Sequence, residues 1–126
     1  MNKQTVSTPN APAAIGPYSQ GVKTGNLIFT SGQLPLNPQS GELVADIEGA
    51  TKQSLDNVKA ILESAGTSMD KIIKTVVFLR DMNDFAAMNA VYTTYFPTNP
   101  PARSAVQVAR LPKDAILEIE AIALTD

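Results

Sequence analysis

The chain has 126 residues, 44% of them hydrophobic, and its 10 Lys and Arg against 12 Asp and Glu give a net charge of -2. This length suits one domain with an apolar core, and the acidic balance argues against a general binder of nucleic-acid backbones. Cys and His are both absent, which excludes disulfides, a thiolate nucleophile, an imidazole base and the commonest zinc ligand sets. Acid–base chemistry must therefore use Asp, Glu, Lys, Tyr or water.

No segment of the sequence suggests a membrane anchor or a second domain. The roughly 20 apolar residues needed to span a bilayer do not occur together, and residues 1–17 lack the apolar region of a secretory signal. There is no repeat, charged tail or long linker. We expect a single domain over residues 1–126 in the cytoplasm, with no membrane and no nucleic acid as partner.

The N-terminal part predicts an extended segment followed by a hairpin. Residues 1–15 are expected to lie extended over the body of the protein. Strand-like runs over 18–24 and 27–34 flank Gly25 and Asn26. This pair favours a tight hairpin turn because both residue types tolerate positive φ.

A turn and a long helix come next. The stretch 36–42 is rich in turn-forming residues. Apolar residues then recur at steps of three and four over 46–65, which predicts an amphipathic helix. Asp46 is the expected N-cap, and Gly66 stands where a helix terminator belongs.

The second half predicts strands with one more helix. A β-branched run predicts a strand over 72–80, and a helix is expected over 84–96, where Pro97 ends it. Two strand-like runs follow, 103–110 and 115–124, joined by a four-residue turn that would let them pair as a hairpin. The sequence thus predicts an α+β fold, a mixed sheet with two helices packed on one face.

The last strand is apolar on both faces. Within 115–124, one set of alternating residues is wholly apolar, and the other set combines Ile116, Ile122 and Leu124 with two glutamates. Two helices can cover only one face of such a sheet. The other face is expected to pack against further copies of the chain, because a large exposed apolar surface is a liability for a monomer.

Glu118 and Glu120 share this second face of the last strand. An unpaired carboxylate is costly to bury in an apolar strand. Either the strand end is solvated and both are surface acids, or a carboxylate lies in a cleft with a pKa suited to a general base.

Arg103 begins a strand directly after a Pro-Pro-Ala loop. A planar guanidinium can bind a substrate carboxylate with two parallel hydrogen bonds. The alternative is an ordinary surface salt-bridge partner. If the last two strands paired as a hairpin, Arg103 would face the far end of the final strand, with Glu118 partway along it.

Four further positions are weaker candidates. Tyr18 is either packed or lining a site, and Ser31-Gly32 is a small pair within a strand, which indicates a close approach of another group to the backbone. Asn89 on the second helix is either exposed or part of the site. Tyr92 and Phe96 are expected to be core residues, and no nucleotide-binding glycine motif occurs.

Taken together, these segments resemble the reactive-intermediate deaminase (Rid, or YjgF) family. The resemblance covers nearly the whole chain, and its most specific part is the series PARS, ARLPKD and EIEA within 100–123. It implies a chorismate-mutase-like α+β fold, assembled as a homotrimer with ligand clefts between neighbouring subunits.

The resemblance also implies roles for the candidate residues. It makes Arg103 the group that binds the substrate carboxylate and Glu118 the group that positions the attacking water. It places Tyr18, Ser31 and Asn89 in the pocket, with substrate contacts from the backbone of Gly32 and Ala105. Many relatives have Cys at the position of Ala105, so a thiol-based role is in doubt while deamination should survive.

The activity that the resemblance implies is hydrolysis of 2-imino or 2-enamino acids, such as 2-iminobutanoate and 2-iminopropanoate, to 2-oxo acids and ammonia. PLP-dependent dehydratases release these intermediates, and the hydrolysis itself needs no metal and no cofactor. Three other readings stay open: a trimeric binder or sensor of 2-oxo acids, a ribonuclease, and a chaperone. Only catalysis requires Glu118, and a ribonuclease is unattractive without His and with an acidic charge balance.

Overall fold

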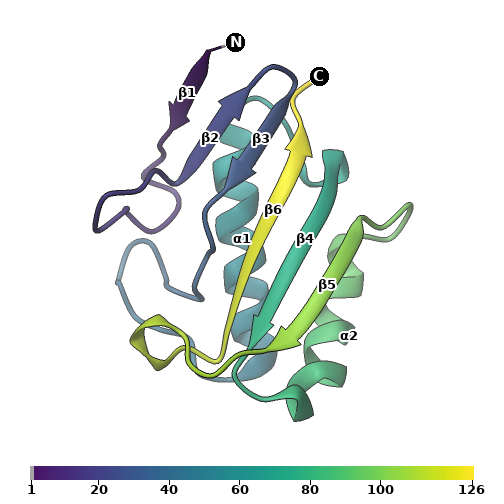
Figure 1. The fold of residues 1–126 in the computed structure, drawn as a ribbon. Helices are drawn as coiled ribbons and strands as arrows, with labels where there is room; N and C mark the ends of the chain where they lie inside the picture. Colours follow the sequence, from purple (N-terminus) through teal and green to yellow (C-terminus); the bar gives the residue numbers. More distant parts are fainter. Residues whose placement is uncertain (1) are drawn as a thin grey trace.

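The computed structural model describes residues 2–126 as a six-stranded mixed sheet with two α-helices on one face (Figure 1). The strand order is β1-β2-β3-β6-β4-β5, and only β4 and β5 run parallel. This confirms the expected α+β class. The elements are β1 (Lys3–Val6), β2 (Gly21–Thr24), β3 (Leu27–Thr30), α1 (Ile47–Ser64), β4 (Ile72–Leu79), α2 (Phe85–Tyr95), β5 (Ala102–Gln107) and β6 (Leu117–Leu124).

The core forms between α1 and the sheet. Asp46 caps α1 by accepting a hydrogen bond from the backbone N–H of Gly49 at 2.8 Å, as the sequence predicts. The middle of the apolar stripe, Leu55, Val58 and Ile61, is fully buried, and so are the alternate β6 residues Leu117 and Ile119. Burial of each such Leu or Ile side chain contributes about 1.5–3 kcal/mol, so this contact fixes which face of β6 points inward. None of the helices within 2–126 is long and apolar enough to cross a membrane.

The N-terminal region contains a strand that the sequence did not predict. The predicted turn at Gly25 is confirmed, since Gly25 has a φ of 56° and connects β2 to β3. Both strands are shorter than expected. In the segment before them, which is described from residue 2, Lys3–Val6 are extended and pair with β2 as the edge strand β1, and turns follow at residues 9–11. Three of the four residues of β1 are polar and exposed, and only Val6 is apolar, so the sequence has no alternation that would have distinguished a strand from an extended tail.

The hairpin that the sequence allowed between the last two strands does not form. β5 pairs in parallel with β4, and β6 pairs with β4 on its other side. The connection is no tight turn, because β5 ends at Gln107 and a short 3-10 helix with left-handed Lys113 and Asp114 precedes β6. This longer connection carries the chain past the end of β4, so β5 becomes an edge strand (Figure 1).

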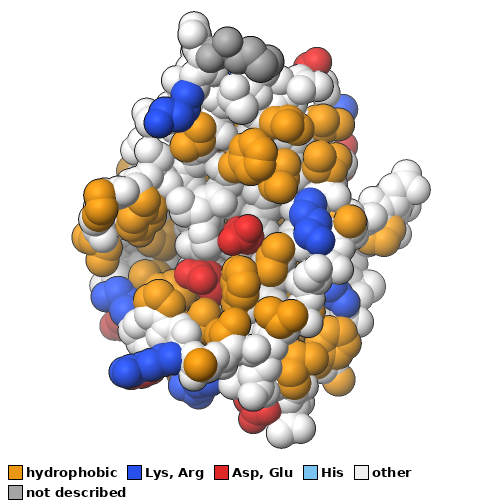
Figure 2. All heavy atoms as spheres, in the orientation of Figure 1, with side chains coloured by type: hydrophobic (Ala, Val, Ile, Leu, Met, Phe, Trp, Pro, Cys, Tyr) orange, Lys and Arg blue, Asp and Glu red, His pale blue; other side chains and the backbone are white. Residues whose placement is uncertain are grey.

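The second face of the sheet carries no helix. It exposes Phe29 and Val106, which are 41% and 44% accessible, on β3 and β5. In the space-filling view, acidic groups lie in the middle of this face with hydrophobic side chains around them (Figure 2). The predicted two-faced character of β6 is confirmed, since its outward residues are half-buried within a single chain.

Candidate active site

Arg103 lies on the helix-covered side of edge strand β5. Its neighbour in the sheet is Thr75, whose side chain is buried beneath α2. The guanidinium Nη1 donates a hydrogen bond to Oδ1 of Asn89 at 2.7 Å, and the guanidinium carbon lies 4.8 Å from the ring centroid of Tyr92 and 5.3 Å from that of Phe85. Arg103 is therefore held against α2 and does not act as a surface salt-bridge partner.

A hollow of about 370 Å³ opens beside Arg103. Asn89, Tyr92 and Pro101 line it together with the arginine. Ala105 follows two residues later on β5 and is half-buried on the same side of the strand. We call Arg103, Asn89 and Ala105 the arginine cluster.

Glu118 lies on the opposite side of the sheet. It is paired with Phe78 on the face without helices and is half-buried. It lines a second hollow of about 480 Å³ with Tyr18, Ser31 and Gly32. Burial, and to a lesser extent the neighbouring charge of Glu120, raise the pKa of Glu118 above its ordinary value. These four lining residues form the glutamate cluster.

The absence of a side chain at Gly32 makes room for the carboxyl group of Glu118. A Cβ at this position would lie 2.6 Å from Cδ and 2.9 Å from Oε2 of Glu118, closer than non-bonded atoms approach. The sequence indicated a close approach to the backbone at Gly32, and the structure shows that the approaching group is this carboxylate.

Ser31 joins the glutamate cluster to the segment that carries Tyr18. Its hydroxyl donates to the carbonyl of Ser19 at 2.5 Å, and its N–H donates to the carbonyl of Gln20 at 2.9 Å. Tyr18 itself is half exposed. The cluster thus combines a rigid strand, β6, with a loop.

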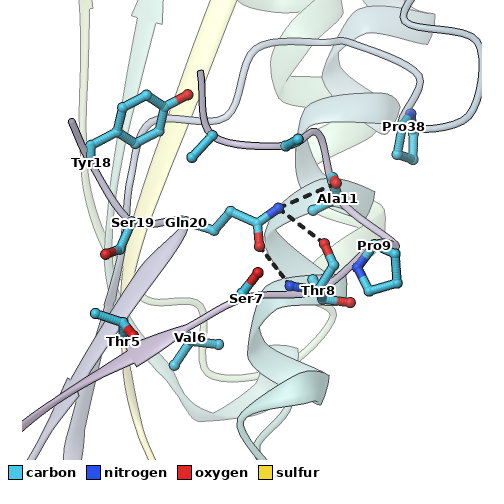
Figure 3. Close-up of a pocket in the computed structure, with 12 residues that line it drawn as sticks. Thr5, Val6, Ser7, Thr8, Pro9, Ala11, Tyr18, Ser19, Gln20 and Pro38 are labelled. Atoms are coloured by element: carbon cyan, nitrogen blue, oxygen red, sulfur yellow. Dashed lines mark hydrogen bonds between the residues drawn. The ribbon is translucent and has the colours of Figure 1, made fainter. Parts of the chain in front are cut away.

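Gln20 holds this loop in place, a role that the sequence analysis did not predict. Its buried amide accepts from the N–H of Thr8 at 2.6 Å and donates to the carbonyls of Thr8 and Ala11 at 3.1 and 3.3 Å (Figure 3). It also donates to the carbonyl of Pro12 at 2.8 Å. An amide one residue before a strand is a weak signal in sequence, because its buried location depends on the path of residues 8–12.

Within one chain the two clusters do not meet. Each lines its own hollow, and the sheet separates them because Arg103 points to its helical side and Glu118 to its bare side. No group of three or more Asp and Glu side chains that could hold a metal ion occurs in the part of the chain that the structure describes.

The fold and the clusters define a small α+β protein that presents a guanidinium and a half-buried carboxylate on opposite sides of one sheet. The comparison with known proteins agrees with the resemblance seen in the sequence: the chain belongs to the Rid (YjgF) family. The family model described as endoribonuclease L-PSP matches residues 8–125.

The relatives include a named enzyme. The 2-iminobutanoate/2-iminopropanoate deaminase of Escherichia coli K12 is 58% identical over 124 residues, which cover 96% of this chain and 97% of that protein. A RutC family protein of Pyrococcus horikoshii is 57% identical over 122 residues, with 96% and 97% covered.

Solved structures have the same fold. E. coli TdcF with bound serine superposes with a TM-score of 0.94 at 53% identity, covering 98% of this chain and 99% of that one. The YjgF gene product of E. coli superposes with a TM-score of 0.93 at 56% identity, with the same coverage.

Proposed function

We propose that this chain is an imine deaminase that hydrolyses 2-iminobutanoate, 2-iminopropanoate and their enamine forms to 2-oxo acids and ammonia. The observation that carries the proposal is that a chain 58% identical to the E. coli deaminase has both a guanidinium held against α2 and, on the other face of the sheet, a half-buried carboxylate of raised pKa.

The active cleft, we propose further, forms between neighbouring copies in a homotrimer. Arg103 and Ala105 of the arginine cluster lie on the edge strand β5, whose outer side pairs with no other strand among residues 2–126. The glutamate cluster opens on the bare sheet face, where Phe29 and Val106 are exposed. A second copy placed against these surfaces would bury the apolar side chains and bring its own arginine cluster to the glutamate cluster of its neighbour.

The chemistry follows from the two charged groups. Arg103 binds the substrate carboxylate through two N–H groups and so places the imine carbon beside Glu118. A water molecule attacks that carbon of the protonated imine while Glu118 accepts a proton from the water. Glu118 then gives this proton to the amino nitrogen of the adduct, the carbon–nitrogen bond breaks as the hydroxyl group of the adduct gives its proton to Glu118, and ammonia and the 2-oxo acid remain. General-base assistance of this kind contributes about 10²–10⁴ in rate.

A threonine dehydratase that supplies 2-iminobutanoate provides the test. The rate of 2-oxobutanoate formation should rise when the purified chain is added. Arg103→Ala should nearly abolish this gain while the oligomer, measured by sedimentation, stays intact. Glu118→Gln should lose hydrolysis but still bind 2-oxobutanoate. Wild-type activity in either variant contradicts the assigned role, and wild-type protein that binds 2-oxobutanoate without hydrolysing imines would be a binder.

Subunit mixing tests the shared cleft. Arg103→Ala and Glu118→Gln proteins, each inactive alone, are unfolded together and refolded in equal amounts. In a random mixture about a quarter of the clefts combine an intact arginine cluster with an intact glutamate cluster from a neighbour, because each cluster is intact in half of the subunits. Recovery of activity toward that fraction is expected. No recovery, with mixed oligomers present, would place both groups in one chain's site.

The family description as endoribonuclease names a second activity. The chain has no His to act as a base or acid, and its net charge is -2. Incubation of RNA with the wild-type protein and with Arg103→Ala distinguishes the two activities. We expect no cleavage that depends on the protein.

A further inference from the structure

Three residues of α2 form a stripe that faces Arg103. Phe85, Asn89 and Tyr92 are spaced four and three residues apart, so they lie on one side of the helix. The two aromatic positions are about 10.5 Å apart along the helix axis, from a rise of about 1.5 Å per residue. The guanidinium carbon lies 5.3 Å from one ring centroid and 4.8 Å from the other, which places it between the two rings and next to Asn89.

Tyr92 is fixed in place by the sheet on which α2 packs. Its side chain is 5% accessible, and its hydroxyl shares a 2.7 Å hydrogen bond with Oγ1 of Thr75 on β4. Burial raises the pKa of Tyr92 above its ordinary value, so the ring stays neutral near pH 7. The sequence indicated Tyr92 as a core residue, which is confirmed. Its ring nevertheless has a second contact, with the side chain of Arg103.

Arg103 takes part in no ion pair within residues 2–126, where the ion pairs are Lys52–Asp56 and Arg110–Asp114. A carboxylate partner would neutralise the guanidinium and occupy two of its N–H donors. An aromatic face attracts the cation through its quadrupole and occupies none of them. Of the five N–H donors of an arginine, the one bond to Asn89 uses only one.

We propose that Phe85 and Tyr92 are positioning residues: their ring faces hold the Arg103 guanidinium in place while leaving its charge and most of its donors free for the substrate carboxylate. This inference rests on the proposed role of Arg103 in binding that carboxylate. It adds two residues that act through the arginine.

The test compares ring removal with hydroxyl removal. Tyr92→Leu and Phe85→Leu each delete one aromatic face, and KM for 2-iminobutanoate and Kd for 2-oxobutanoate should rise about 10-fold, the size of a partly buried cation–π contact, with a smaller change in kcat. Tyr92→Phe keeps the face and loses only the bond to Thr75, so its KM should stay within about 2-fold of wild type.

Tyr95→Leu is the matched control. Tyr95 lies on the same helix but bonds to Asp56 on α1 at 2.7 Å instead of contacting Arg103, so this variant loosens the packing of α2 without removing a ring from the arginine. Its KM should remain near wild type. An equal rise in KM for Tyr95→Leu would overturn the inference, because it would trace the effect to general loosening. Should Tyr92→Leu fail to fold, the half-buried Phe85 still gives the decisive variant.

Failure of the inference is distinguishable from failure of the proposed function. If Arg103→Ala loses substrate binding while both ring deletions bind 2-oxobutanoate as wild type does, the positioning role is refuted and the role of Arg103 stands. If Arg103→Ala itself binds and turns over normally, the role of Arg103 is refuted, and the positioning role falls with it.

Discussion

The two clusters hold their charged groups in different ways. The arginine cluster is built on a helix and a strand, where Arg103 is fixed by an amide and two rings with no opposing charge. The glutamate cluster places Glu118 on a strand beside a like charge, with a loop completing its surroundings. An arginine keeps its charge at all physiological pH values, whereas the charge of Glu118 depends on its environment. In the proposed function, the arginine cluster therefore binds the substrate, and the glutamate cluster transfers protons at a pH that its surroundings set.

The glycine that makes room for Glu118 distinguishes the two clusters, and Gly32→Ala is expected to have the largest effect on the rate. The new methyl group would overlap the Glu118 carboxyl, and this flexible end would rotate away at little cost in stability. Displacement of a catalytic group by about 1 Å can lower the rate about 10²-fold. We therefore expect kcat to fall by about that factor, while KM and the binding of 2-oxobutanoate, which depend on Arg103, change little.

Steady-state kinetics and a thermal melt of the Gly32→Ala protein check this expectation. A large rise in KM with kcat preserved would show that the two clusters do not divide binding from proton transfer. A large fall in melting temperature would show instead that Gly32 serves the packing of the sheet.

A change in the loop of the glutamate cluster is expected to lower the activity less than Gly32→Ala does. Gln20→Ala removes four hydrogen bonds of a buried amide and leaves the N–H of Thr8 without that partner, which should lower the free energy of unfolding by about 1–3 kcal/mol. With residues 8–18 loosened, Tyr18 loses its fixed position, and kcat/KM should fall several-fold. Hydrogen exchange of residues 8–18 and urea unfolding measure both effects.

Gln53→Ala is the control for that change. Gln53 lies on α1, far along the chain from the loop, and makes one side-chain hydrogen bond, to Asn57. It should leave exchange of residues 8–18 and kcat/KM unchanged. If Gln20→Ala also leaves exchange in this segment unchanged, the amide does not hold the loop.

Local patterns predicted α1 and the strand β6, which carries Glu118. The three- and four-residue steps of α1 and its cap at Asp46 appear as expected, because burial of one helix face against a sheet is a local, periodic requirement. The alternation of β6 likewise placed Glu118 and Glu120 on the face away from Leu117 and Ile119, as observed. Such periodic signals need no knowledge of distant partners.

The features that the sequence did not predict depend on contacts between residues far apart in the chain. Strand pairing between β5 and β4 is set by a crossover that no periodicity encodes, so the sequence placed Arg103 beside the wrong strand. Its contact with Phe85 follows from that pairing, and the buried location of Gln20 follows from the path of another segment. The division of the candidate residues into two clusters could therefore be seen only in three dimensions.

The smallest effect is expected from a change in the surroundings of Glu118, whose pKa depends on them. Burial and the charge of Glu120 both raise the pKa of Glu118, and a general base works only when it is ionised. Activity should therefore fall as the pH drops through this raised pKa, at a higher pH than for an ordinary glutamate. Glu120→Gln removes the like charge and so lowers the pKa of Glu118, which moves the acid limb of the kcat/KM profile to lower pH. An acid limb that stays in place would show that burial alone sets this pKa, and one that moves to higher pH would contradict the assignment of Glu118 as the base.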